Sequence, residues 1–166
     1  LLKNHPRKTP VKITTYVEAP PGSGLGSSSA LVVALVTAIS EYYGIPYDEY
    51  QTAAAALRIE RDICDLPGGK QDQYSAAFGG FNYIEFLQDG RTIVNPLRLN
   101  YKTQNMLEMN TVLYYVGSPR SDVRIIEGTS QNLKKDSKTV DITHKIKDAC
   151  IEFKRSLLVG DVKKLS

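Results

Sequence analysis

Alternating patterns of apolar and polar residues define the elements expected in the first part of the chain. Residues 11–19 (VKITTYVEA) alternate and are rich in β-branched side chains, which predicts a strand. After a run of glycine and serine, apolar helix formers predict a helix from about Ser28 to Tyr43, with Gly44 and then Pro46 beyond its end. Because its apolar residues occupy nearly all of its faces, we expect this helix to lie in the protein centre.

The middle of the chain predicts a second helix and a hairpin. Residues 46–64 read as a helix in which Asp48 is a suitable cap and several alanines permit close packing. Residues 65–80 form a loop bracketed by glycines, and we expect a short helix inside it. Residues 81–86 and 91–99 predict paired strands around a turn, with Pro96 weakening the end of the second strand.

The last third of the chain has weaker patterns. Residues 111–117 predict a strand, and helical stretches are expected near 121–134 and 141–158. Polar residues interrupt the strands between residues 100 and 110. We therefore place a domain boundary there, which divides the chain into residues 1–105 and 106–166.

Composition and charge narrow the classes of function. The chain has 166 residues and a net charge of +3, a mild excess that suits an anionic small substrate and is a weak signal for nucleic acid. Cys64 and Cys150 lie far apart and fit no metal or redox spacing, so we expect reduced thiols and a cytoplasmic protein. The longest apolar run, residues 30–39, is too short to span a membrane. The chain does not begin with Met, and we expect it to be part of a longer one.

The segment PPGSGLGSSSA, residues 20–30, carries the strongest chemical signal. Small residues allow close approach to the backbone, and the N-terminus of the following helix offers unpaired N–H groups and a positive dipole end. Both features favour a bound phosphate. A Walker-type loop would need a lysine after its last glycine, and the dinucleotide motif would need a different glycine spacing. The alternative is an ordinary turn with a serine N-cap.

This segment resembles the nucleotide-phosphate motif of the GHMP kinase superfamily, whose members include galactokinase, homoserine kinase and mevalonate kinase. The stretch PGGKQDQYSAAFGGFNYIEF, residues 67–86, is similar to the part of the sugar 1-kinases that carries the catalytic aspartate. Together with TTYVEAPPGSGLGSSSALVVAL and IVNPLRL, it resembles most the D-glycero-D-manno-heptose 7-phosphate kinases. The superfamily's N-terminal substrate motif and C-terminal glycine-rich motif have no match here.

The resemblance implies an α+β chain with the GHMP kinase fold. Its N-terminal domain would resemble domain 2 of ribosomal protein S5, and its C-terminal domain would be ferredoxin-like, with both incomplete in this chain. It also implies that ATP and Mg²⁺ are bound. The residues expected to hold the nucleotide are Pro21, Gly22, Ser23, Gly24, Leu25, Gly26, Ser27, Ser28 and Ser29.

The resemblance also implies roles in phosphoryl transfer for four side chains. Ser28 and Glu60 would bind Mg²⁺, and for Glu60 the alternative is a solvated surface acid paired with a neighbouring arginine. Asp72 would accept the proton of the attacking hydroxyl, and its alternative is a turn or helix cap. Lys70 would keep Asp72 ionised or contact a phosphate, although a lysine facing solvent is nearly as plausible.

The expected reaction is phosphorylation of the anomeric hydroxyl of a sugar phosphate, with heptose 7-phosphate converted to the 1,7-bisphosphate. Fucokinase or galactokinase activity is the alternative within the superfamily, and a non-catalytic nucleotide-binding module is an alternative of another class. A carboxylate beside the phosphate loop argues against a pure binder. Arg120, in GSPRSD, is either a phosphate ligand or part of a simple capped helix start. We expect no nucleic-acid or membrane partner, and a homo-oligomer is compatible with the sequence.

Overall fold

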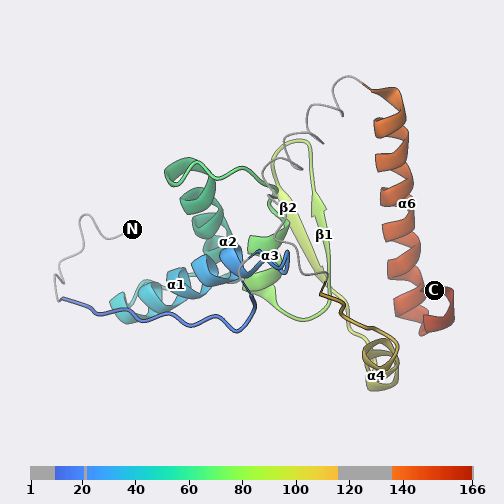
Figure 1. Cartoon of the computed structure of the whole chain (residues 1–166), viewed down its shortest axis with the longest axis horizontal. Helices are drawn as coiled ribbons and strands as arrows, with labels where there is room; N and C mark the ends of the chain where they lie inside the picture. Colours follow the sequence, from blue (N-terminus) through green and yellow to red (C-terminus); the bar gives the residue numbers. More distant parts are fainter. Residues whose placement is uncertain (1–9, 21, 116–135, 166) are drawn as a thin grey trace. The chain divides into compact units, whose positions relative to one another are not determined.

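The structure is a computed structural model that describes residues 10–20, 22–115 and 136–165 (Figure 1). The described residues form two compact units, one ending at Ala77 and one beginning at Phe78. The domain boundary expected after residue 105 stays a prediction. No helix among the described residues is long and apolar enough to cross a membrane.

The first unit is built on two packed helices, α1 (Ser27–Tyr43) and α2 (Glu49–Arg58). Val33 and Val36 of α1 pack with Ala56 of α2, and Ala53 and Ala56 are completely buried. Alanine at these positions lets the two helices approach closely, as the sequence indicated. Burial of apolar surface stabilises the folded state by roughly 25 cal/mol per Å². The packed contact between α1 and α2 is therefore the main hydrophobic core of this unit.

Local signals set the ends of both helices. Gly44 adopts a left-handed conformation (φ 67°), and its N–H bonds the last carbonyls of α1. Asp48 and Gln51 form a reciprocal capping box at the start of α2, with Gln51 N–H donating to Asp48 Oδ1 at 2.7 Å. These two ends agree with the sequence predictions.

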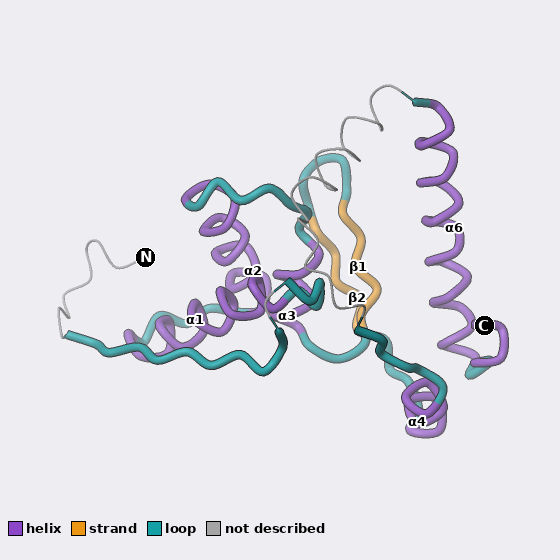
Figure 2. Tube along the Cα trace, in the orientation of Figure 1, coloured by secondary structure: helices purple, strands orange, loops and turns teal. Residues whose placement is uncertain are grey.

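Two expectations about this unit are wrong. The buried residues of α1 lie on one face, so the helix is not enclosed on all sides within the described chain. Residues 11–19 are extended but form no strand, because a strand needs a hydrogen-bonded partner and none of the described residues supplies one. The segment runs as a loop alongside α1 (Figure 2).

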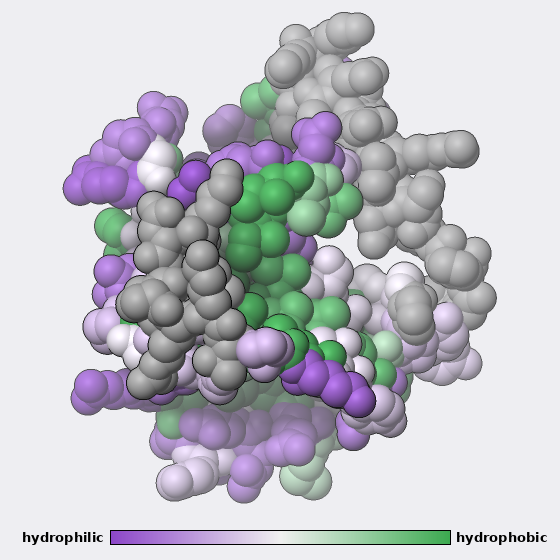
Figure 3. Space-filling model, turned by 90° about the vertical axis from the view of Figure 1, so that its left-hand side faces the viewer, coloured by the Kyte–Doolittle hydropathy of each residue, from purple (hydrophilic) through white to green (hydrophobic). Residues whose placement is uncertain are grey.

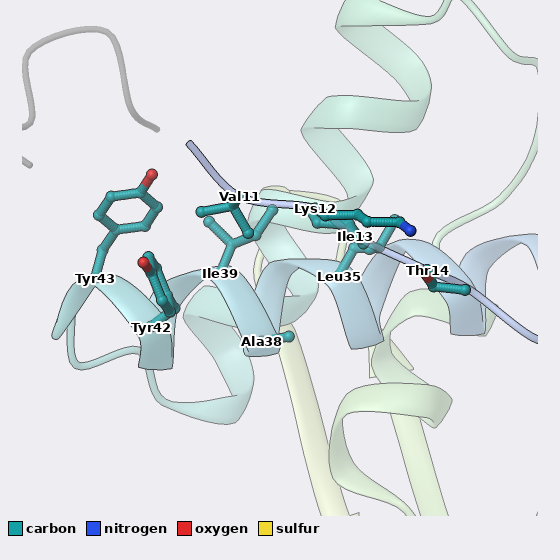
Figure 4. Close-up of a pocket in the computed structure, with 9 residues that line it drawn as sticks. All are labelled: Val11, Lys12, Ile13, Thr14, Leu35, Ala38, Ile39, Tyr42 and Tyr43. Atoms are coloured by element: carbon teal, nitrogen blue, oxygen red, sulfur yellow. The ribbon is translucent and has the colours of Figure 1, made fainter. Parts of the chain in front are cut away.

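Between this extended segment and α1 lies an apolar cavity of about 360 Å³ (Figure 4). Its lining residues are Val11, Lys12, Ile13, Thr14, Leu35, Ala38, Ile39, Tyr42 and Tyr43. Val11 and Ile13 remain about half exposed. The same side of the molecule shows hydrophobic surface in Figure 3.

The α2 helix continues directly into a π-helical turn, η1 (Ile59–Ile63), and a loop then leads to α3 (Gln71–Phe78). A π turn adds one residue to the helical repeat and shifts the direction of the side chains that follow, which is why such turns occur often at functional sites. Here the turn carries Glu60, the one buried acidic residue that the described chain contains.

The second unit contains the predicted hairpin. Strands β1 (Asn82–Phe86) and β2 (Thr92–Pro96) pair antiparallel, with Ile84 opposite Val94. Gly90, at φ 87°, closes the turn. Of residues 111–117, expected to be a strand, positions 111–115 are not in a strand, and the rest lie outside the described residues, as does the helix expected near 121–134.

Helices α4 (Tyr101–Met109) and α6 (Ser137–Val159) complete the second unit with a short 3₁₀ helix, η2 (Val162–Leu165). The α4 helix lies where the sequence indicated only a polar interruption, and its cap is Asn100, whose Oδ1 accepts from Thr103 N–H at 2.8 Å. The α6 helix begins earlier than expected because Asp136 caps it. Cys64 and Cys150 are both free and exposed.

Candidate functional site

The glycine-rich loop has a backbone that only glycine adopts readily. Gly22, Gly24 and Gly26 have φ values of 73°, 74° and 68°. The N–H of Ser23 donates to the carbonyl of Pro20 at 3.1 Å and closes a turn. Ser23 Oγ is buried and has no hydrogen-bond partner within the described chain. Pro21 lies outside the described residues.

The start of α1 is open to a ligand. Gly26 occupies the N-cap position, and no side chain caps the helix. The ordinary alternative, a serine N-cap, is therefore absent. The first N–H groups of a helix have no intrahelical acceptor, so those of Ser27, Ser28 and Ser29 are available to an anion at the positive end of the helix dipole.

The hydroxyls of Ser28 and Ser29 do not cap the helix but hydrogen-bond to Glu60. Ser28 Oγ and Ser29 Oγ donate to Glu60 Oε1 at 3.2 and 3.0 Å. Glu60 is only 3% exposed, which excludes the alternative of a solvated surface acid. Ser28 is exposed, so this cluster has one side that solvent reaches.

Gln73 completes the cluster and was missed by the sequence analysis. Its side chain is fully buried, and its Nε2 donates to Glu60 Oε2 and, at 3.0 Å, to Ser29 Oγ. Its Oε1 is buried without a partner in the described chain. A signal was present in the sequence, because Gln73 lies four residues before Ala77, and helical spacing puts both on the face of α3 that packs against the core.

Asp72 lies against the glycine loop although 46 positions separate it from Gly26. A Cβ added to Gly26 would lie 3.3 Å from Asp72 Cγ and 3.5 Å from both carboxylate oxygens. The carboxylate thus lies against the N-cap residue of α1, in space that the missing side chain leaves open. It is exposed, belongs to the first turn of α3 and makes no hydrogen bond with the described residues.

Arg61 and Lys70 lie next to this cluster in the chain. The Arg61 guanidinium donates to the carbonyls of Leu66 and Gly69 at 3.0 and 2.9 Å, so it braces the loop before α3 and does not pair with Glu60. Lys70 is exposed and lines a cavity with Arg58 and Arg61. Arg120, the other candidate phosphate ligand, lies outside the described residues.

The donor set suits Mg²⁺ only in part. No three His, Cys, Asp or Glu side chains of the described chain gather to hold a metal ion. Mg²⁺ is commonly held by one or two carboxylates together with substrate phosphates and water, so a full protein cage is not required. A single carboxylate, Glu60, and a hydroxyl, Ser28, beside the uncapped start of α1 fit that pattern.

Comparison with known proteins gives a consistent result. Residues 1–80 match the model of the GHMP kinases N terminal domain. The chain is 42% identical over 147 residues to D-glycero-alpha-D-manno-heptose 7-phosphate kinase of Campylobacter jejuni, covering 89% of this chain and 43% of that protein. It is 36% identical over 107 residues to galactokinase of Thermotoga maritima, covering 63% of this chain and 30% of that protein.

A solved structure supports the same fold. The crystal structure of a D-glycero-D-manno-heptose 1-phosphate kinase from Bacteroides thetaiotaomicron superposes with a TM-score of 0.73 at 43% identity, over 89% of this chain and 42% of that one. The chain thus spans less than half the length of the relatives that it matches. Its mixed helices and strands are an incomplete version of their fold. Residues 1–80 thus match the N-terminal domain of the GHMP kinases, and the proteins that the chain resembles are sugar kinases of that family.

Proposed function

We propose that the protein is an ATP- and Mg²⁺-dependent kinase that phosphorylates the anomeric hydroxyl of a sugar phosphate, D-glycero-D-manno-heptose 7-phosphate, to give the 1,7-bisphosphate. One observation carries the proposal: the exposed carboxylate of Asp72 lies against Gly26, the N-cap residue of α1, where no side chain caps the helix. An anion site and a proton acceptor are thus adjacent, which is what phosphoryl transfer to an alcohol needs.

The glycine loop and the start of α1 form the proposed nucleotide site. Backbone N–H groups from Ser23 to Ser29 would bind the phosphates, and the positive φ values of the loop keep side chains out of their way. The helix dipole adds favourable charge at the same point. Pro21 belongs to the proposed loop by sequence alone.

Glu60 and Ser28 form the proposed metal site. A bound Mg²⁺ would draw negative charge from the transferring phosphate. Glu60 is fixed for this role by hydrogen bonds from Ser29 and Gln73, which hold its two oxygens in place. Ser28 presents its hydroxyl from the solvent side of the same cluster.

Asp72 is the proposed general base. Its carboxylate accepts the proton of the anomeric hydroxyl as that oxygen bonds to the γ-phosphorus, the bond from phosphorus to the bridging oxygen breaks, and ADP leaves. The carboxylate has no competing hydrogen bond within the described chain, so both oxygens are free to accept this proton. Lys70 lies two residues before Asp72, and its positive charge would attract a phosphate group of a bound substrate.

The remaining assignments follow from the same proposal. Residues 1–105 would be part of the N-terminal domain of the kinase, and residues 106–166 the start of its C-terminal domain. The partners would be ATP and the sugar phosphate, and the protein would act in the cytoplasm. Galactokinase or fucokinase activity is the second candidate, since galactokinases are among the similar proteins.

The test is a substrate panel with ATP and Mg²⁺ on the whole protein. ADP release is measured with heptose 7-phosphate, galactose, fucose and mevalonate, and the Asp72→Asn variant serves as the matched control. We expect release with heptose 7-phosphate that the variant largely abolishes. Release with galactose or fucose instead would favour the second candidate. Tight ATP binding without release on any substrate would favour a nucleotide-binding module.

A further inference from the structure

A second cavity in the first unit carries positive charge, most of it from two arginines that the proposed reaction site does not use. It has a volume of about 410 Å³ and lies between α2, the π turn and the loop before α3. Its lining residues are Ala54, Leu57, Arg58, Arg61, Asp62, Gly68 and Lys70. Three cationic side chains therefore surround it, with one carboxylate.

One of the three cations is held in place by the backbone. The Arg61 guanidinium donates to the carbonyls of Leu66 and Gly69, one from each terminal nitrogen. A Cβ on Gly68 would come within 2.5 Å of Arg61 Nη2, so the guanidinium lies in the space that the missing side chain of Gly68 leaves open. A cation fixed in this way loses little side-chain entropy when an anion binds beside it.

The other two cations lack an acidic partner. Arg58 and Lys70 form no ion pair with any of the described residues. Like charges gathered in one cavity repel one another, and a dianion removes that repulsion. A phosphate monoester carries the charge and the acceptor oxygens that arginine binds well.

The cavity also has groups that suit a polyol. Ala54 and Leu57 provide an apolar wall, and Asp62 can accept hydrogen bonds from hydroxyl groups. Lys70 joins this cavity to the reaction site, because two residues of chain span at most about 7 Å and Asp72 is two residues further on. The backbone of the cavity wall at Lys70 is thus within two residues of the proposed base.

We propose that this cavity binds the phosphate group that the sugar substrate already carries, with Arg58, Arg61 and Lys70 as its ligands. The inference rests on the proposed kinase function for the identity of the substrate, whereas binding of a phosphate monoester can be measured without turnover. It explains how an enzyme of this kind would select a sugar phosphate over the free sugar.

The test uses Arg58→Gln, because Arg61 also braces the loop and Lys70 is close to the base. Calorimetry on the whole protein compares heptose 7-phosphate, the unphosphorylated heptose, inorganic phosphate and ATP. We expect Arg58→Gln to weaken heptose 7-phosphate binding on the order of tenfold. The affinities for the unphosphorylated heptose and for ATP should stay unchanged. Arg98→Gln, an exposed arginine of the second unit, is the matched control and should change none of them.

The outcomes separate this inference from the proposed function. Unchanged heptose 7-phosphate affinity in Arg58→Gln, in a protein that phosphorylates this sugar, would overturn the cavity assignment and leave the kinase proposal standing. Weakened ATP binding in Arg58→Gln would also overturn the cavity assignment, because the cavity would then hold a phosphate of the nucleotide. Loss of phosphate-monoester affinity in a protein that phosphorylates no sugar would support the cavity and refute the kinase proposal. Circular dichroism confirms that each variant is folded.

Discussion

Replacement of Gln73 by Met tests whether the buried cluster around Glu60 is held together as the structure shows. The side chains have similar length, but Met cannot donate to Glu60 or to Ser29. A hydrogen bond to a charged group contributes about 1.5–3 kcal/mol and a neutral one about 0.5–1.5 kcal/mol. Against this loss, Met also removes Oε1, which is buried without a partner at a cost of about 1–3 kcal/mol.

The net expectation is a loss of about 1–2 kcal/mol in the free energy of unfolding, measured by urea denaturation. Gln71→Met, an exposed glutamine on the same helix, is the control and should change stability by less than about 0.5 kcal/mol. The Mg²⁺ concentration needed for half-maximal activity should also rise roughly tenfold or more, because Glu60 would lose one of the groups that orient it. Unchanged stability together with unchanged Mg²⁺ dependence would show that the amide does not hold Glu60.

Four further predictions concern single side chains. Asp72→Asn should lower single-turnover rates on the order of 10² to 10⁴ while ATP affinity, measured by titration, changes little; a fall below tenfold would make Asp72 a loop residue. Glu60→Gln should raise the Mg²⁺ requirement and lower stability, because its amide would face the donor Nε2 of Gln73; unaltered Mg²⁺ dependence would remove Glu60 from the metal site. Gly26→Val should weaken ATP binding more than Gly24→Val in calorimetry, since residue 26 is the N-cap beside the first N–H groups of α1, and a side chain there has less room than at residue 24. Hydrogen bonds from the Thr139 side chain and the Lys138 N–H lower the pKa of Asp136. The stabilisation of α6 by this cap is therefore complete at pH values above the ordinary pKa of an aspartate, and it is lost as the pH falls through the lowered pKa of Asp136. The helicity difference between the native chain and Asp136→Ala should therefore vanish in strong acid.

Elements whose ends depend on residues nearby in the sequence could be predicted from the sequence. The end of α1 at Gly44, the capping box of Asp48 and the β1–β2 hairpin all depend on contacts within a few positions. The missed α4 helix has the same local character, since Asn100 caps it, but its polar composition concealed the helical pattern. Residues 11–19 show the opposite case, because strand formation depends on a partner that local sequence does not specify.

In the candidate site, too, features set by neighbouring residues could be predicted from the sequence, and features set by distant contacts could not. The glycine loop could be recognised because three closely spaced glycines and a following helix define its chemistry locally. The burial of Glu60 and its bonds to two serines join positions 31 and 32 residues apart, and nothing beside Glu60 in the chain indicates them. Gln73 was hidden for a further reason: a polar residue on a helix usually faces solvent, and only its register with Ala77 pointed inward.

Gly26 meets two separate structural requirements, and their coincidence links the two halves of the proposed reaction. Its φ of 68° turns the backbone into α1 without a side-chain cap, which leaves the first N–H groups of the helix open to an anion. Its missing side chain leaves the space in which the Asp72 carboxylate lies, 3.3 Å from where a Cβ would be. The spacing between the proposed phosphate site and the proposed base therefore depends on glycine at this position. Because proximity in phosphoryl transfer depends on shifts of an ångström or less, even alanine at this position would separate the two groups and reduce turnover, although neither group is itself changed.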